Sequence, residues 1–548
     1  MLERVQQDVK VVHEASTYCT GDVGEGIVPG TASEGGSRMN RIGMAKLFAI
    51  SAVVLLASLT LASTGGSKKP EPVAWTGPVS KANCGPGDRT EGGLQGETTR
   101  QERLSGDSEN GYNCNLELVG QFRGEGTKSQ GALAWSDHCA YYTTINNPLL
   151  EHRGTIVLDV SDPAHPRVST HLDAPAMLDP HESMKLNDRR KLLAGGQYNG
   201  PWFAIYDVSG DCSHPVLKSS IQLPGSAAHM SGWAPDGMTY YLTQNPQMGP
   251  GPLYILDVSD PSNVKQLPTW HFRGEGKPHD ANLSADGTRL FAGQFGDVGS
   301  LPDGLVIEDV SDYQFRRPNP QIRIVSKLFW SDSSGAEQML PFSANGRHYI
   351  LSSDEFGGFG AAGGLAAACD RGASPFGVPQ IIDISDERNP HIIAKVMIEV
   401  DAPENCRAFL ANPPDLGSAI PGPYPDGYSA ERCNLDRADN PTMLACSFEQ
   451  AGLRVFDIRD LHHPKEIAYW KPPALRTAFL PGSFTWAPGA DRTADRTAGT
   501  PRFVKVGDEL NLWTVSDGNG FQVLRFTANF KTQYKDVLAE ALRNQQGN

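Results

Sequence analysis

The chain has 548 residues, of which 39% are hydrophobic, so it can bury a large core and the composition argues against wholesale disorder. Its 63 Asp and Glu residues outnumber its 48 Lys and Arg residues, which argues against a protein held on nucleic acid by phosphate contacts. The 58 glycines and 40 prolines indicate many turns, and therefore many short strands.

The N-terminal stretch predicts an exported protein. Residues 1–38 are polar and glycine-rich, and we interpret them as an extension outside the fold, with Met39 as the true start. Two basic residues and an apolar run over 47–61 follow, so 39–64 is predicted to be a signal peptide. The alternative is an uncleaved anchor, although the run is shorter than the roughly 20 residues of a membrane span. We expect a secreted or periplasmic protein whose mature chain has no membrane span.

The cysteines agree with export. Nine are present, and eight remain when the leader and everything before it are removed, an even number that suits disulfides. Proximity in the sequence favours pairing Cys84 with Cys114 and Cys406 with Cys433, while the full connectivity stays open. The alternative is reduced, buried thiols that act as small hydrophobic groups. Residues 65–115, which hold two of the cysteines, are predicted to be a flexible segment.

A repeat runs through the rest of the chain. An apolar run that ends in Asp-Val-Ser-Asp, or in a close variant, recurs first at about 50 residues and then at longer intervals. Its first aspartates are Asp159, Asp207, Asp257, Asp309, Asp383 and Asp457. Asp followed by Pro after a strand favours a turn, because proline cannot pair in a β-ladder. We therefore interpret these aspartates as structural. Short strands at this period are typical of the blades of a β-propeller.

The repeats predict an all-β fold, a seven-bladed β-propeller over 116–528. Each repeat contains four expected strands, and six marked repeats are followed by a degenerate seventh that lacks its outer strand. We expect Leu116–Phe122 to supply that strand and close the ring, because an open ring would leave two exposed sheet edges. Residues 529–548 are predicted to form a short C-terminal helix. A monomer is expected.

The repeated unit resembles the LVIVD-repeat family of exported bacterial β-propellers over roughly residues 116–526. That resemblance implies the architecture and little about chemistry, because most members of the family have no assigned activity. The blade count and the spacing of His-Asp and Asp-Gly pairs are also similar, more loosely, to the selenium-binding protein and methanethiol oxidase propellers. Those proteins are copper-linked, and the similarity carries over only to histidines near the channel.

Three histidines are predicted to occupy one position of the repeat. Counting seven residues back from the Asp or Asn of each first turn gives His181, His229 and His279 in consecutive repeats. The same count gives Gln130, Gln338 and Asn405 in three other repeats. Equivalent positions surround the central axis, so we expect the three rings to converge at the channel mouth, flanked by the two glutamines. Neutral imidazoles suit copper or zinc, and three of them leave an open coordination position.

Two neighbouring carboxylates belong to the same prediction. Glu182 and Asp280 are expected to orient the rings or to ligate the ion directly. Two alternatives stay open, namely histidines bonded to the backbone of a neighbouring blade and a metal-free ligand site with polar or catalytic histidines. No serine-hydrolase elbow, zinc-protease motif or phosphate-binding loop occurs in the sequence, so no catalytic residue is predicted.

Two functions follow from these observations. The first is an exported propeller that binds a protein, a glycan or a small molecule at its top face, with a copper or zinc site in the channel. The second, implied by the looser resemblance, is a copper-dependent oxidoreductase of small sulfur compounds. A hydrolase or lyase that uses the channel histidines is a weaker third. The fold by itself does not choose among them.

Overall fold

The computed structural model describes residues 77–124, 133–143, 152–245, 251–272, 277–295, 303–360, 364–411, 427–476 and 491–544. All of these belong to the compact unit that spans 70–548. The predicted extension, the predicted signal peptide and Gln130 lie outside the described residues, so the predictions made for them stay predictions. Among the described residues, no helix is long and apolar enough to cross a membrane.

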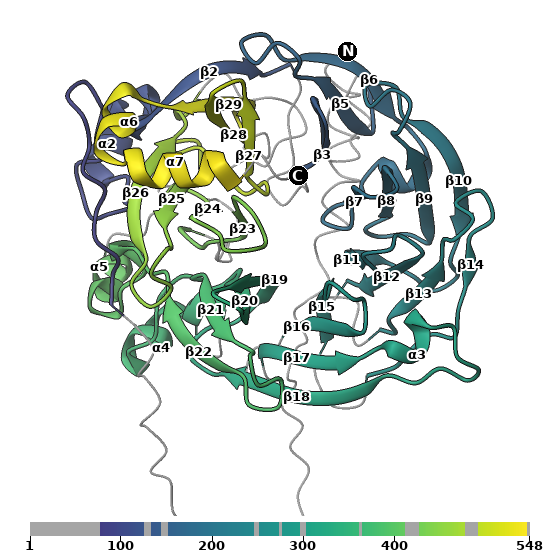
Figure 1. Ribbon diagram of the computed structural model, residues 1–548. Helices are drawn as coiled ribbons and strands as arrows, with labels where there is room; N and C mark the ends of the chain where they lie inside the picture. Colours follow the sequence, from purple (N-terminus) through teal and green to yellow (C-terminus); the bar gives the residue numbers. More distant parts are fainter. Residues whose placement is uncertain are drawn as a thin grey trace, which may run out of the picture. The chain divides into compact units, whose positions relative to one another are not determined.

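Seven antiparallel sheets surround a central axis, which confirms the predicted seven-bladed β-propeller (Figure 1). Each blade has four strands that run in chain order from the axis outwards, except that the last blade takes its outer strand from the N-terminal side and blade six has a fifth, outermost strand, β1 (Tyr112–Cys114). Blades one to three comprise β3 (Leu133–Ser136), β4 (Cys139–Tyr142), β5 (Thr155–Asp159) and β6 (Arg167–Leu172); β7 (Lys185–Asn187), β8 (Leu192–Gly196), β9 (Trp202–Asp207) and β10 (Val216–Gln222); and β11 (Ala228–Trp233), β12 (Thr239–Gln244), β13 (Tyr254–Asp257) and β14 (Lys265–Gln266).

The remaining blades follow the same order. Blades four and five comprise β15 (Lys277–Leu283), β16 (Arg289–Phe295), β17 (Asp303–Asp309) and β18 (Arg323–Trp330), and β19 (Ala336–Ala344), β20 (Arg347–Asp354), β21 (Gln380–Asp383) and β22 (His391–Lys395). Blades six and seven comprise β23 (Arg432–Leu435), β24 (Met443–Ser447), β25 (Leu453–Asp457) and β26 (Lys465–Lys471), and β27 (Arg502–Val506), β28 (Glu509–Ser516), β29 (Gly520–Phe526) and β2 (Leu116–Phe122). The second and third strands are almost wholly buried, because both faces of a blade pack against its neighbours.

The repeated aspartate ends the third strand of each marked blade and organises the turn that follows. In all six repeats its side-chain Oδ1 accepts a hydrogen bond from the backbone N–H two residues further on, at 2.8–3.1 Å. This is the bond of an Asx turn, which an aspartate forms more readily than most residues do. The repeat signature therefore records a turn that sends the chain to the outer strand.

The ring closes as predicted. Strand β2 pairs antiparallel with β29, with Leu116 opposite Phe526 and Phe122 opposite Phe521. Helices α6 (Ala528–Gln533) and α7 (Lys535–Asn544) follow β29 directly, and the buried side chains of Phe530 and Ala541 join the core of blades six and seven. The predicted C-terminal helix is thus present as two short helices.

Residues 77–115 are folded, whereas a flexible segment was expected over 65–115. Strand β1 (Tyr112–Cys114) adds a fifth strand to blade six by pairing with β26, and α2 (Arg100–Ser105) begins with a capping box made by Thr99 and Glu102. The guanidinium of Arg454, which is buried, binds Glu91 at 2.6 Å and Glu466 at 2.7 Å. Glu91 comes from this segment and the other two residues from blade six, so a buried ion network fixes the segment to the propeller.

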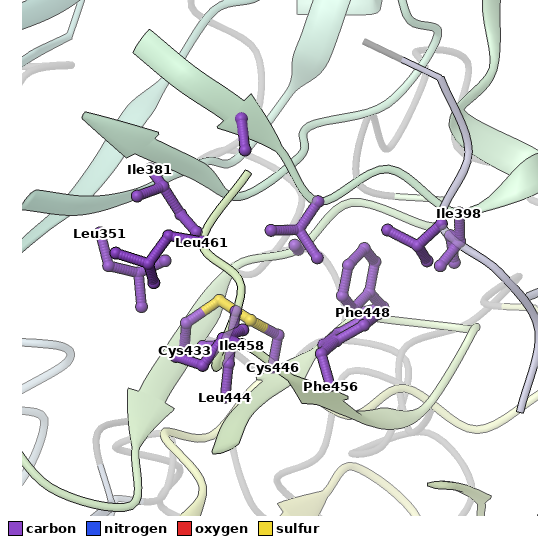
Figure 2. Close-up of a cluster of buried hydrophobic side chains, with 14 of the residues drawn as sticks. Leu351, Ile381, Ile398, Cys433, Leu444, Cys446, Phe448, Phe456, Ile458 and Leu461 are labelled. Carbon is purple, nitrogen blue, oxygen red and sulfur yellow. A yellow bond between two sulfur atoms is a disulfide. The ribbon is translucent and has the colours of Figure 1, made fainter. Parts of the chain in front are cut away.

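The eight cysteines form four disulfides. Cys84 pairs with Cys114, as proximity favoured, and Cys139 in blade one pairs with Cys212 in blade two. The expected pair of Cys406 with Cys433 is wrong, because Cys406 bonds Cys369 and Cys433 bonds Cys446. The first of these joins α4 (Gly364–Arg371) to α5 (Cys406–Ala411), and the second links β23 to β24, where the two cysteines lie opposite each other. Figure 2 shows the second bond beside Leu444 and Ile458 in the core.

Replacing Gly120 by valine should weaken ring closure. Gly120 follows the bulge in β2, and a Cβ atom there would meet the backbone oxygen of Pro163 at 2.2 Å. Overpacking of this kind costs about 1–3 kcal/mol, so the thermal midpoint should fall by several degrees. The matched control Leu118→Val changes an exposed side chain of the same strand and should shift the midpoint much less. An unaltered midpoint for Gly120→Val would show that the strand does not pack as described.

The disulfide pattern is open to direct mapping. Digestion without reduction, followed by mass spectrometry, should recover linked peptides that contain Cys369 with Cys406 and Cys433 with Cys446. The other two pairs should appear in the same digest. A linked peptide that joins Cys406 to Cys433, or free thiols among these eight residues in the exported protein, would contradict the pattern.

Candidate functional site

Three histidine rings from consecutive blades lie side by side at the channel. His181 directly precedes blade two, His229 lies in β11 and His279 lies in β15. The ring centroids of His181 and His229 are 4.7 Å apart, and those of His229 and His279 are 4.3 Å apart. All three side chains are buried. The sequence-predicted histidines are therefore brought together, although about 50 residues separate each from the next.

Glu182 lies among the three rings. Its Oε1 is 3.2 Å from Nε2 of His181, and its Oε2 is 3.1 Å from Nδ1 of His229 and 3.7 Å from Nε2 of His279. One carboxylate therefore contacts all three imidazoles, in the place that the sequence analysis gave it. His181 itself has a left-handed backbone conformation, with φ of 50°, which few residues other than glycine adopt.

Two further charged residues complete the cluster, and sequence reasoning missed both. Glu337 Oε2 lies 2.8 Å from Nδ1 of His279, and Arg432 Nη2 lies 2.8 Å from Oε1 of Glu182. The same guanidinium nitrogen also binds Oε1 of Glu337. Arg432 thus bridges two buried carboxylates and offers the cluster its own positive charge.

The strand pairing explains why Glu337 was missed. The inner strands β15 and β19 each have a bulge after their first pairs, and the bulged residues are His279 and Glu337. The hairpin of blade five turns on two residues, with Ala344 opposite Arg347, whereas six residues separate the last pair of β15 and β16. The paired ladder of β19 also runs three residues further after its bulge than that of β15, so Asn345 lies eight residues after Glu337, whereas Asp286 lies seven after His279. Counting back seven residues therefore selected Gln338, one residue too late. A β-bulge re-aims a side chain, which suits a residue that must point into a channel.

The other predicted site residues have structural roles. Gln338 Oε1 accepts a hydrogen bond from the backbone N–H of Cys433 at 3.0 Å and so links blades five and six. Asp280 Oδ2 accepts the backbone N–H of Met339 at 2.9 Å, which links blades four and five. Asn405 lies in a short 3-10 helix, Pro403–Asn405, because the true inner strand of blade six is β23. The short run Arg-Cys-Asn-Leu directly before the second strand was the available signal for Arg432.

Burial and ion pairing shift the pKa values of the residues in this cluster in different directions. Burial disfavours the charged form of Glu182, but Arg432 and His181 outweigh it and hold the pKa of Glu182 well below its usual range. Burial lowers the pKa of His229 to about 4, so this ring is neutral at physiological pH and keeps a lone pair available. Burial raises the pKa of Glu337, although Arg432 acts against it.

A second carboxyl pair lies in the neighbouring blade. Glu431, the residue before Arg432, is buried and lies against Glu449. Burial first, and the charge of Glu449 next, raise the pKa of Glu431 well above its usual range. Glu449 in turn accepts a bond from Nε of Arg496 at 2.6 Å. Blades five and six thus contribute carboxyl groups where blades two to four contribute imidazoles.

The donor set fits a transition-metal ion. Glu182 Oε2, His229 Nδ1 and His279 Nε2 are buried and face one another, and Nε2 of His279 has no hydrogen-bond partner within the part of the chain that the structure describes. Metal–ligand bonds of about 2.0–2.1 Å at a tetrahedral angle separate ligand atoms by roughly 3.3 Å, close to these contacts. Candidate ligand atoms of His181, Glu182 and His229 all lie within 4.8 Å of one another, as do those of Glu182, His279 and Glu337. Imidazole nitrogens with a carboxylate oxygen suit zinc or copper.

Comparison with known proteins identifies one repeat. The LVIVD repeat matches residues 249–266, so the chain carries this repeat. No curated protein matches the chain significantly. Among solved structures, the β-propeller domain of Cps50 (Swd1) from Myceliophteria thermophila is similar at 10% identity and a TM-score of 0.45, covering 75% of this chain and 100% of that one. Sqt1 from Chaetomium thermophilum is similar at 13% identity and a TM-score of 0.43, covering 75% and 99%.

Replacing Glu431 by glutamine should change how stability depends on pH. The folded protein holds the proton of Glu431 more tightly than the unfolded chain does, so this group lowers the free energy of unfolding as the pH rises above its ordinary pKa of 4.5. Glutamine has no proton to lose, so Glu431→Gln should be more stable relative to the parent at pH 8 than at pH 4.5. Thermal melts of both proteins at the two pH values test this. A difference that shrinks at pH 8 would contradict the assignment.

Proposed function

We propose that this protein is an exported ligand-binding β-propeller that holds one transition-metal ion, zinc or copper, at the channel through His181, His229, His279 and Glu182. The proposal rests above all on the buried atoms of Glu182, His229 and His279 that face one another at 3.1 and 3.7 Å, of which Nε2 of His279 has no hydrogen-bond partner among the described residues. A buried polar atom without a partner is costly, and a cation bound to these three atoms would remove that cost.

The surroundings of these residues support the same proposal. Arg432 occupies Oε1 of Glu182, so Oε2 remains for an ion and the carboxylate would bind through one oxygen. Glu337 accepts from Nδ1 of His279 and so fixes that ring with its Nε2 towards Glu182. A carboxylate behind a ligating histidine orients the ring and raises its basicity. A bound ion would supply an electrophilic position for a ligand that enters from the channel mouth.

Metal binding is the direct test. The exported protein, purified without chelators, should contain about one equivalent of zinc or copper by elemental analysis. After chelation it should bind Zn²⁺ or Cu²⁺ by calorimetry, and the H181A/H229A/H279A variant should lose this uptake while remaining folded by circular dichroism. Weakening of uptake by at least about a hundredfold is expected, since loss of a residue that only orients a ligand already costs 10- to 100-fold.

A matched control is available on the outer turns. His165, His214 and His463 each bind an aspartate three residues earlier and are exposed. The H165A/H214A/H463A variant removes as many histidines and should leave metal uptake unchanged. Equal loss of uptake in both triple variants, or a parent protein that takes up neither ion, would overturn the proposal. Oxygen consumption with methanethiol by the copper-loaded protein would favour the copper-dependent oxidoreductase instead of a binding protein.

A further inference from the structure

A second set of equivalent residues lies closer to the channel mouth than the histidines. Phe295 ends β16 and pairs with Lys277, two residues before His279. In blades three and five the equivalent residues donate their backbone N–H to Ala227 and Gly335, at 2.8 and 2.7 Å. The position is held by Tyr198, Asn245, Phe295, Glu355 and Glu449 in blades two to six. These five side chains therefore form the layer next to the histidine cluster.

The layer is aromatic above the histidines. The ring of Tyr198 lies 4.0 Å from that of His181, and the ring of Phe295 lies 5.0 Å from that of His279, between centroids. Tyr198 and Phe295 are only partly buried, so part of each ring faces open space. Phe356 extends this aromatic wall, with its ring 5.4 Å from that of Phe295.

The layer is acidic on blades five and six. Glu449 is buried and lies against Glu431, which is also buried. Glu355 is buried as well, and it holds in blade five the position that Phe295 holds in blade four. Carboxyl groups thus hold on blades five and six the position that aromatic rings hold on blades two and four.

We propose that this mouth binds a small organic cation, with its ammonium group between the rings of Tyr198 and Phe295 and the carboxyl group of Glu355. The face of an aromatic ring attracts a cation within about 6 Å of the ring centroid, and a carboxylate attracts it further. An anionic ligand would be repelled by this carboxylate, and a neutral apolar ligand would bring no opposite charge to it. The inference deepens the proposed function in one respect: it names the class of ligand that would enter the proposed channel site.

The test compares two molecules of the same shape. Choline and its uncharged isostere 3,3-dimethyl-1-butanol are titrated separately into metal-free protein by calorimetry. Choline should bind at least about tenfold more tightly, a difference that corresponds to 1.4 kcal/mol. The substitution Phe295→Leu keeps the apolar volume and removes the ring, and Glu355→Gln removes one charge; each should weaken choline binding about fivefold or more. Phe315→Leu changes an exposed ring of blade four and should leave binding unchanged.

The outcomes separate this inference from the metal proposal. Choline binding to protein that takes up no metal would support the inference and overturn the metal site alone. Uptake of zinc by protein that does not bind choline would overturn the inference alone. Equal affinity for choline and its isostere would also overturn it, because the charge would then contribute nothing. Should Glu355→Gln fail to fold, Phe295→Leu still decides the question.

Discussion

The pairing of β2 with β29 is the constraint on which the rest of the structure depends. A ring of blades places its inner strands around one axis only if the last sheet is completed, and here the strand that completes it comes from residues 116–122. Without that pairing, β29 would be an unpaired edge of blade seven and β2 would have no strand to pair with. The residues of the channel cluster come from blades two to six, so their arrangement depends on closure of the ring and not on any local segment.

Within the closed ring, the positive charge of Arg432 compensates two buried carboxylates. Its guanidinium binds Glu182 and Glu337, which would otherwise repel each other near the axis. Removing one partner of such a buried network typically costs 3–5 kcal/mol, because the others are left uncompensated. The two carboxylates also contact different rings, since Glu182 faces the imidazoles of His181 and His229 while Glu337 fixes that of His279.

The sequence was sufficient for the architecture because the repeat encodes it locally. The aspartate of each marked repeat accepts a bond within its own turn, so its signal does not depend on distant residues. The same periodicity placed His181, His229 and His279 together. It failed for Gln338, because the ladder of blade five is longer and shifted the count by one residue, and for Arg432, because an insertion hid the inner strand of blade six.

The disulfides illustrate a second limit on inference from sequence. Cys406 and Cys433 are neighbours along the chain, yet Cys433 lies opposite Cys446 in the sheet while Cys406 reaches Cys369 on another helix. Such pairings follow from three-dimensional proximity. Asp280 shows the same point for polar side chains, since its backbone partner belongs to the next blade, 59 residues away.

The position of the closing strand also bears on the order of events during biosynthesis. The exposed pair of Glu117 and Arg525 across the seam joins residues that are 408 positions apart. Strand β2 therefore cannot pair until almost the entire chain has been made, because its partner β29 is one of the last segments synthesised. Contacts of such long range slow the final folding step. Blade seven therefore keeps β29 as an unpaired edge until the two ends of the propeller meet.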